Sequence, residues 1–441
     1  MKCSAARWRR ACVGVAAAGM LVAPVSAGVA YGAPSPDPSS SSSPSSPSST
    51  SSLSSPSTTS PSPSTTPPSP STTPPSPSTT PPTANAFPQL TADVSARLDA
   101  AIQRVMREAD VPGVTVGLWA PGKGSYVRSF GVADKATGAP MEPNLNMRIG
   151  SETKTFTVTA LLRLVDEGKV GLDDPIGKYV SGVPGGDRIT LRELAGMRSG
   201  LFNYSEDPDF DKALTSDPQR PFTPQELLDY SFKHPVGFQP GEKFEYSNTN
   251  LILVGLVVEK VSGVPLNQYI DQNVVRPAGL THTLFPTGAE FPTPHARGYT
   301  NQSASGQVVD ATDWNPSWGW AAGAMISDLQ DLRSWARTLA TGTLLTPETQ
   351  AQRLATAPTG VPGAGYGLGI FNVQGWIGHN GSLPGYESLT LYLPESGATL
   401  VVLLNTDILY NGQEPGTLFG QAITEVVTPD HVFNLPVGAG Q

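Results

Sequence analysis

Apolar and polar positions change their period along the chain, and the changes predict the order of helices and strands. Residues 91–110 have the three-to-four-residue spacing of an amphipathic helix. Two runs rich in β-branched and aromatic residues follow, GVTVGLWA and SYVRSFGVAD, and the PGKG between them predicts a turn that joins two strands. From about 151 to 340 the pattern favours helices and loops, with clear helices in NTNLILVGLVVEKVSG and SDLQDLRSWARTL. After Tyr366 we expect short strands at 367–373, 376–381, 387–393 and 398–405, and then a last helix in GTLFGQAITEVV.

Strands at both ends of this region with helices between them predict an α/β fold of the α+β kind. The two ends would build one antiparallel sheet flanked by helices, and the middle would form a mostly helical lobe. A ligand cleft is expected where the lobe meets the sheet.

The first thirty residues have the composition of a secretory signal peptide. MKCSAARWRR is basic, residues 11–27 are small and apolar, and small residues near 25–30 offer cleavage sites. The alternative is an uncleaved anchor, although Pro24 interrupts the short apolar run. Both cysteines, Cys3 and Cys12, lie in this leader, so the exported chain would contain neither a disulfide nor a thiolate metal site. The sequence therefore predicts a secreted protein, extracellular or associated with the cell wall, without a stable membrane anchor.

Residues 31–85 are dominated by Ser, Pro and Thr, with SPSTTPP repeated in tandem at 62–82, and predict an extended, disordered linker. Such a segment is either a spacer that spans a wall or a solubilising tail. The remaining residues, 86–441, are long enough for one large domain. Removal of the four basic residues of the leader takes the net charge from −9 to −13, which argues against a nucleic-acid partner.

The helix predicted after residue 150 contains a lysine where local physics disfavours one. Its apolar residues cover nearly all faces, Gly168 is a natural stop, and Lys154 lies in the first turn, at the positive end of the helix dipole. Ser151 precedes it by three residues, so the hydroxyl and the amine share a helix face. Burial and the dipole both favour a neutral amine, which can accept the serine proton. The backbone N–H of Ser151 would also point at a developing oxyanion.

A second motif, Tyr-x-Asn, can assist proton transfer and hold a substrate. It occurs as Tyr246 and Asn248 before a predicted buried helix, and also as Tyr299 and Asn301. We favour Tyr246, because the helix that follows would fix its position.

A third motif is His379-Asn380-Gly381, which is the only His-x-Gly in the sequence and lies on a predicted strand. A glycine at this place lets a ligand approach the backbone closely.

In this order the three motifs resemble those of the serine β-lactamase and penicillin-binding superfamily. Together with PGEKFEYSNTNLILVGLVVEKVSG, LRELAGMRSGL, RPAGLTHTLFP and WGWAAGAMISDLQDLRSWA, the Tyr-Ser-Asn form looks like the branch of class C β-lactamases and D-alanyl-D-alanine carboxypeptidases. The similarity extends over nearly all of 88–428. It implies a β-lactamase/transpeptidase-like fold and a serine hydrolase that needs no cofactor.

The resemblance also implies a role for each motif residue. Ser151 would be the acylated nucleophile, Lys154 its base, and Tyr246 the proton relay. Asn248 would hold the acyl amide, and the backbone N–H groups of Ser151 and Ser382 would form the oxyanion hole. The segment from His379 through Asn380 and Gly381 to Ser382 would contact the substrate. Trp318 or Trp320 would line the cleft or would simply pack.

The sequence departs from the class C pattern at the third motif, where Lys-Thr-Gly is usual. A histidine there is more similar to the carboxypeptidase and esterase members, and Asn380 replaces a hydroxyl that recognises a substrate carboxylate. No Lys or Arg follows Arg353, so Arg297 is the remaining candidate for that purpose.

The leading prediction is a D-alanyl-D-alanine carboxypeptidase-like enzyme acting through an acyl-enzyme, with peptidoglycan stem peptides, other peptides or small esters as substrates. The alternatives are an esterase or D-amino-acid amidase of the same fold, a β-lactamase, and a non-catalytic penicillin-binding or wall-sensing module. The last is disfavoured because a binder does not need Lys154 and Tyr246 together. A Gly-x-Ser-x-Gly elbow and a His-Glu-x-x-His metal motif are both absent from the sequence, so we predict no bound metal.

Overall fold

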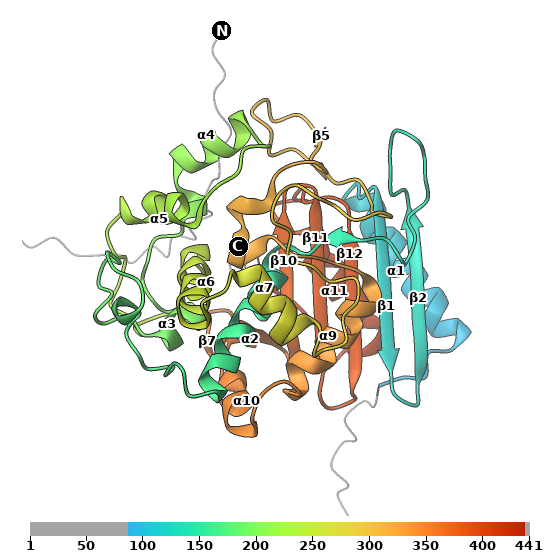
Figure 1. The fold of residues 1–441 in the computed structure, drawn as a ribbon. Helices are drawn as coiled ribbons and strands as arrows, with labels where there is room; N and C mark the ends of the chain where they lie inside the picture. The colour runs from blue at the N-terminus through green and yellow to red at the C-terminus, as the bar shows by residue number, and fades with distance from the viewer. Residues whose placement is uncertain (1–86, 437–441) are drawn as a thin grey trace, which may run out of the picture. The chain divides into compact units, whose positions relative to one another are not determined.

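The computed structural model describes residues 87–436; the predicted leader at 1–30 and linker at 31–85 lie outside the described residues. An antiparallel sheet of eight strands forms the centre, in the order β2-β1-β12-β11-β10-β9-β8-β7 (Figure 1). Its strands are β1 (Gly113–Ala120), β2 (Gly124–Gly131), β7 (Ala357–Pro358), β8 (Ala364–Tyr366), β9 (Phe371–Val373), β10 (Trp376–Leu383), β11 (Tyr386–Leu393) and β12 (Ala398–Leu404).

The first and last strands of the domain lie side by side in this sheet. β1 pairs with β12, with Val114 opposite Leu404, and on its other edge β1 pairs with β2. The prediction that both ends of the domain build one antiparallel sheet is therefore confirmed, as is the α/β fold class.

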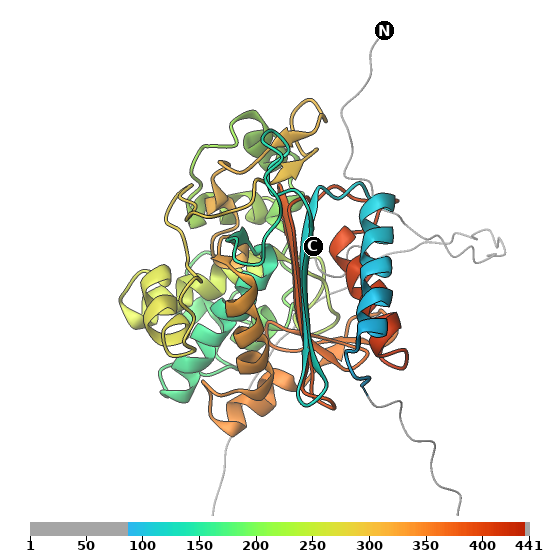
Figure 2. The ribbon, with the colours of Figure 1, turned by 90° about the vertical axis from the view of Figure 1, so that its right-hand side faces the viewer.

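Helices cover both faces of the sheet. α1 (Ala92–Glu108) and α11 (Pro415–Val427) lie against one face, and α2 (Thr153–Asp166), α9 (Leu329–Thr341) and α10 (Pro347–Leu354) lie on the other side (Figure 2). Because both faces are covered, β1 and β12 are buried along their whole length, which explains their continuous apolar runs.

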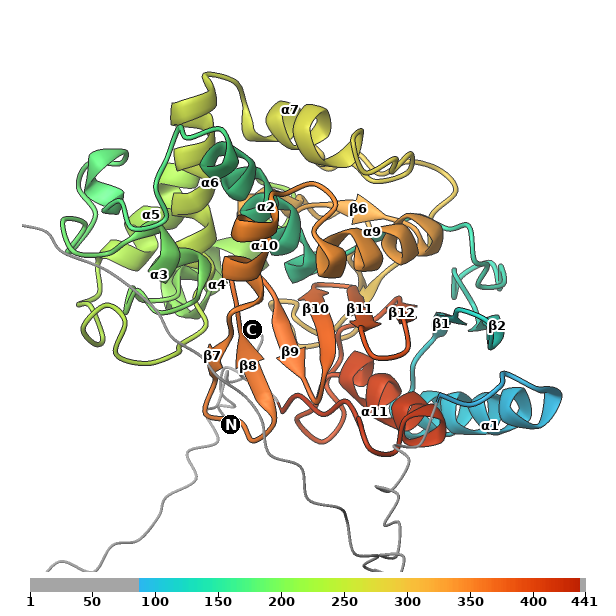
Figure 3. The same ribbon diagram turned by 90° about the horizontal axis from the view of Figure 1, so that it is seen from below.

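The middle of the chain forms the helical part on the side of α2 (Figure 3). α2 packs against α6 (Asn248–Ser262), and both helices are buried on most sides, as their sequences predict. α2 ends as expected, with Gly168 in the left-handed region at φ +68°. The other helices of this part are α3 (Leu191–Ala195), α4 (Pro208–Ser216), α5 (Pro224–Phe232), α7 (Leu266–Ile270) and α8 (Trp320–Gly323). Short pairs also occur, β3 (Met147–Arg148) with β6 (Ile326–Ser327) and β4 (Tyr299–Thr300) with β5 (Val309–Asp310).

The prediction of a single strand at 367–373 is wrong. The chain instead makes a hairpin, in which Tyr366 at the end of β8 pairs with Phe371 at the start of β9. Gly369 turns the chain at φ +70°, and a Cβ there would lie 2.7 Å from the side chain of Val158 on α2. The glycine thus permits both the turn and the close contact with α2.

Among residues 87–436, no single helix is long and apolar enough to cross a membrane. One bent pair, α6 and Leu266–Val275, passes that test together on length and composition, with 78° between its two parts.

Candidate active site

Ser151 lies in a short turn, Gly150–Glu152, that is pressed between α2 and the sheet. Gly150 has φ +49°, and a Cβ on it would lie 2.7 Å from the backbone nitrogen of Ser382 on β10. A Cβ on Gly381 would lie 2.0 Å from the carbonyl oxygen of Ile149. The two glycines therefore allow the serine turn to contact the strand that carries the third motif.

Lys154 is completely buried one helical turn after Ser151. Its Nζ is 2.8 Å from Ser151 Oγ and donates a hydrogen bond to the carbonyl oxygen of Ala322, also at 2.8 Å. Burial lowers the pKa of this amine well below its usual value. No carboxylate pairs with Lys154 among the described residues, so burial favours the neutral form of the amine.

Tyr246 is the tyrosine that joins this pair. Its ring centre is 4.9 Å from Lys154 Nζ, and its hydroxyl lies near the Ser151 hydroxyl. Burial raises the pKa of the phenol well above 10, which the nearby Ser151 hydroxyl offsets only in part, so the phenol keeps its proton. The alternative, Tyr299, instead accepts a hydrogen bond from the backbone N–H of Lys135.

His379 faces the same side of β10 as Gly381 and is buried. Its Nδ1 is 2.5 Å from the carbonyl oxygen of Asn380 and must donate to it, so Nε2 accepts from the Tyr366 hydroxyl, 3.2 Å away. Burial lowers the pKa of His379 to about 3. The ring is therefore neutral, with both nitrogens occupied.

Asn380 points to the opposite face of the sheet, as the alternation of side chains along a strand requires. Its Nδ2 donates to Glu414 Oε2 at 2.9 Å, next to the start of α11. The structure thus brings Ser151, Lys154, Tyr246 and the backbone of Gly381 and Ser382 together, but it turns the side chain of Asn380 away from them.

Asn248 is the first residue of α6 and is partly exposed. Its neighbours are Asn203 and Ser205, which the sequence reasoning missed because they lie more than forty residues earlier in the chain. Their segment directly follows LRELAGMRSGL, one of the stretches that carry the family resemblance, and that was the available signal.

Glu152 was missed as well, although an acid between the motif residues Ser151 and Lys154 is a visible signal. It is 1% exposed, and burial raises its pKa to about 8 even though the hydroxyls of Ser388 and Thr390 lower it in part. Its Oε1 has no hydrogen-bond partner within residues 87–436.

The other candidates have structural partners. Arg297 is 2.9 Å from Asp310 and 3.8 Å from Asp134, so its charge is already paired. The ring of Trp320 packs so closely against Gly255 that a Cβ on this glycine would lie 2.8 Å from it. Trp318 contacts Phe210, with ring centres 6.0 Å apart.

A group that could hold a metal occurs at the start of α9, where the ligand atoms of His282, Asp328 and Asp331 lie within 4.8 Å of one another. The sequence reasoning did not find it. Asp328 already accepts hydrogen bonds from the first turn of α9, and Asp331 accepts from the backbone of His282 and from Thr283.

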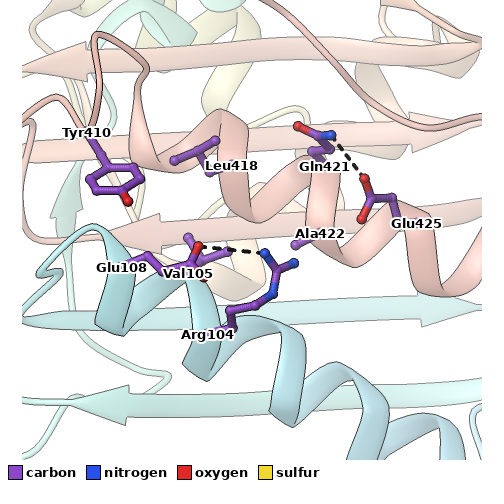
Figure 4. A pocket seen from close by; sticks show the side chains of 8 residues that line it. All are labelled: Arg104, Val105, Glu108, Tyr410, Leu418, Gln421, Ala422 and Glu425. Atoms are coloured by element: carbon purple, nitrogen blue, oxygen red, sulfur yellow. Dashed lines mark hydrogen bonds and ion pairs between the residues drawn. The ribbon is translucent and has the colours of Figure 1, made fainter.

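A pocket of about 130 Å³ lies between α1 and α11 (Figure 4). The ion pair of Arg104 and Glu108 lines one side of it and the pair of Gln421 and Glu425 lines the other. No predicted site residue lines this pocket, which lies on the face of the sheet opposite α2.

Comparison with known proteins identifies the family. The sequence matches the beta-lactamase family over residues 98–414. The chain belongs to the beta-lactamase family. Among solved structures, this family member is similar to a D-stereospecific amidohydrolase from Streptomyces sp., with 30% identity, a TM-score of 0.68, and coverage of 76% of this chain and 98% of that one. It is also similar to the D-amino acid amidase from Ochrobactrum anthropi SV3, with 28% identity, a TM-score of 0.66, and coverage of 77% and 97%.

A curated relative is Protein flp of Staphylococcus aureus, which is 26% identical over 73% of this chain. The matched region spans only 65% of that longer protein. These similarities confirm the predicted superfamily and its fold, and they make the protein a serine hydrolase of the β-lactamase and penicillin-binding type.

Proposed function

We propose that the protein is a secreted amidohydrolase and esterase that transfers an acyl group from an amide or ester to Ser151 and then to water. The observation that carries the proposal is the fully buried Lys154 amine, 2.8 Å from Ser151 Oγ and without an ion-pair partner among the described residues. Secretion is inferred only from the composition of the leader.

Acylation begins when Ser151 Oγ attacks the substrate carbonyl carbon and its proton passes to the neutral Lys154 amine. The backbone N–H groups of Ser151 and Ser382 stabilise the negative oxygen of the tetrahedral intermediate. Tyr246 gives its phenolic proton to the leaving nitrogen or oxygen, the bond to the carbonyl carbon breaks, and the proton held by Lys154 restores the phenol.

Deacylation uses the same groups in the reverse direction. A water molecule attacks the acyl carbon and passes a proton through Tyr246 to Lys154. The ester bond to Ser151 then breaks, Lys154 returns this proton to Ser151 Oγ, and the carboxylic acid leaves. No group other than Ser151, Lys154, Tyr246 and the backbone donors is required.

The leaving group is proposed to be uncharged. A terminal carboxylate, such as that of a D-alanyl-D-alanine peptide, needs a cation or several donors. In the described structure, the neutral ring of His379 has both nitrogens occupied, Asn380 faces away, and Arg297 is paired with two carboxylates. The strands after Arg353 contain no Lys or Arg. The relatives named as a D-stereospecific amidohydrolase and a D-amino acid amidase support an amide with a D-configured acyl group.

The test compares turnover of four substrates by the full chain: D-phenylalanine amide, p-nitrophenyl acetate, an N-acylated D-alanyl-D-alanine peptide and benzylpenicillin. The variants are Ser151→Ala and, as a matched control, Ser303→Ala in a separate loop. We expect hydrolysis of the amide and the ester by the wild type and the control, and none by Ser151→Ala.

Three results would overturn the proposal. Preferred turnover of the D-alanyl-D-alanine peptide would establish the carboxypeptidase that the sequence favours. Rapid benzylpenicillin hydrolysis would establish a β-lactamase. Folded protein that turns over none of the four would establish a binding or sensing module.

A further inference from the structure

Asn248 takes part in a hydrogen-bond network whose direction fixes the orientation of its side-chain amide. The backbone N–H of Asn248 donates to Asn203 Oδ1 at 3.0 Å, and a backbone N–H is always a donor. Oδ1 of Asn203 is therefore identified, and its Nδ2 is the atom that faces Glu206, at 3.4 Å. Asn203 is thus held in one orientation by a neighbour that only donates and another that only accepts.

The Ser205 hydroxyl transmits this orientation to Asn248. Ser205 Oγ is 3.0 Å from Asn203 Oδ1 and 3.1 Å from the side-chain amide of Asn248. Because Asn203 Oδ1 can only accept, the Ser205 hydroxyl donates its single proton to that oxygen. Ser205 Oγ must then accept from Asn248, so Nδ2 of Asn248 faces Ser205. The reverse rotamer would place two oxygens against each other without a proton between them.

The Oδ1 atom of Asn248 is consequently the end that the network leaves for a ligand. Ser247 has an extended backbone, φ −147° and ψ 119°, so Tyr246 and Asn248 project to the same side, and Tyr246 projects to Lys154. The charge in the network is negative, from the exposed Glu206 carboxylate. An amide oxygen acceptor in a network that contains a carboxylate favours a hydrogen-bond donor as its ligand, above all a cationic donor.

We propose that Asn248 Oδ1, held outward by Ser205 and Asn203, accepts a hydrogen bond from a free amino group on the acyl part of the substrate. The substrates are then amides and esters of amino acids with an unblocked α-amino group. This inference rests on the proposed function for the reaction itself and adds the acyl class. Asn248 is a specificity residue in it, and Ser205 is a positioning residue.

The test is equilibrium binding, so that it does not depend on turnover. Titration calorimetry at pH 7 would measure D-phenylalanine amide and its N-acetyl derivative against the full chain carrying Ser151→Ala. We expect the free amine to bind about tenfold more tightly, the value of one good charge-assisted hydrogen bond.

Two double variants, each with one further substitution added to Ser151→Ala, separate the positioning role of Ser205 from a general loss of structure. Ser205→Ala removes the hydroxyl oxygen that accepts from Asn248 Nδ2 and so orients Asn248. The amide can then rotate, and the preference should fall to about twofold or less. Ser303→Ala is the matched control, because Ser303 is also partly exposed and also makes two hydrogen bonds through its hydroxyl. It should keep the full preference.

Equal binding of the two ligands, tighter binding of the N-acetyl ligand, binding of neither, or a preference that Ser205→Ala leaves intact would each overturn the inference. Failure of the proposed function is a separate result, since it would appear as absent turnover in the wild type whatever the binding ratio.

Discussion

The Glu152 carboxyl is buried directly after the nucleophile in the chain, and its replacement by Gln should stabilise the protein. The side chain is 1% exposed, and Oε1 finds no partner within the described residues. Gln has nearly the same shape and never ionises. The substitution Glu152→Gln therefore removes the titration while it keeps the packing.

The magnitude follows from the pKa of the carboxyl, which burial raises from 4.5 to about 8. Below pH 4.5 the group is protonated in both the folded and the unfolded chain and has no effect. Above that, the unfolded chain ionises and the folded chain does not, so stability falls by about 1.4 kcal/mol per pH unit until about pH 8. At pH 7 the loss is about 3 kcal/mol.

Urea unfolding of the full chain between pH 4.5 and pH 8 measures this difference. Glu152→Gln should match the wild type near pH 4.5 and exceed its free energy of unfolding by about 3 kcal/mol at pH 7. Glu142→Gln, at an exposed position, is the control and should change little at any pH. A variant less stable than the wild type, or a difference that does not grow with pH, would show that burial does not keep Glu152 protonated in the folded protein.

Three further substitutions test the site. Gly381→Ala places a Cβ 2.0 Å from the Ile149 carbonyl, so kcat/KM for p-nitrophenyl acetate should fall on the order of 10²-fold, whereas Gly237→Ala, with no contact closer than 3.7 Å, should not change it. Lys154→Arg carries a permanent charge, so the acylation rate, measured by stopped flow, should fall on the order of 10³-fold. In the wild type the same rate should fall as the pH drops and Lys154 takes up a proton. The pKa of His379 is lowered to about 3, so below pH 6.5 the unfolded chain binds a proton that the folded chain does not bind. Acid should therefore destabilise the wild type, by about 3 kcal/mol at pH 4.5. His379→Gln has no such group, so its unfolding at pH 4.5 should not show this loss.

The local features of the fold could be predicted from the sequence, because each depends on neighbouring residues. Periodicity and apolar runs located α1, α2, α6 and the long strands, and the spacing of Ser151 and Lys154 placed both groups on one helix face. The hairpin within 367–373 escaped prediction because Gly369 is required by a contact with Val158, more than two hundred residues away.

The surroundings of the site depend on long-range contacts and could be predicted less well from the sequence. Alternation along β10 shows that His379 and Asn380 face opposite sides, but the packing of α11 decides which side is remote from Ser151. Ser205 and Asn203 meet Asn248 through tertiary structure alone, and the environment of Glu152 is supplied by β11. A pattern within one segment contains no information on such partners.

In the proposed reaction, Ser151 carries the acyl group during turnover. The most direct measurement mixes the full chain with p-nitrophenyl acetate, quenches it in acid within milliseconds, and determines the intact mass and the modified peptide. We expect one acetyl group on Ser151, a burst of p-nitrophenol equal to the enzyme concentration, and neither in Ser151→Ala. Steady turnover without an adduct, or an adduct that persists in Ser151→Ala, would show that Ser151 does not carry the acyl group.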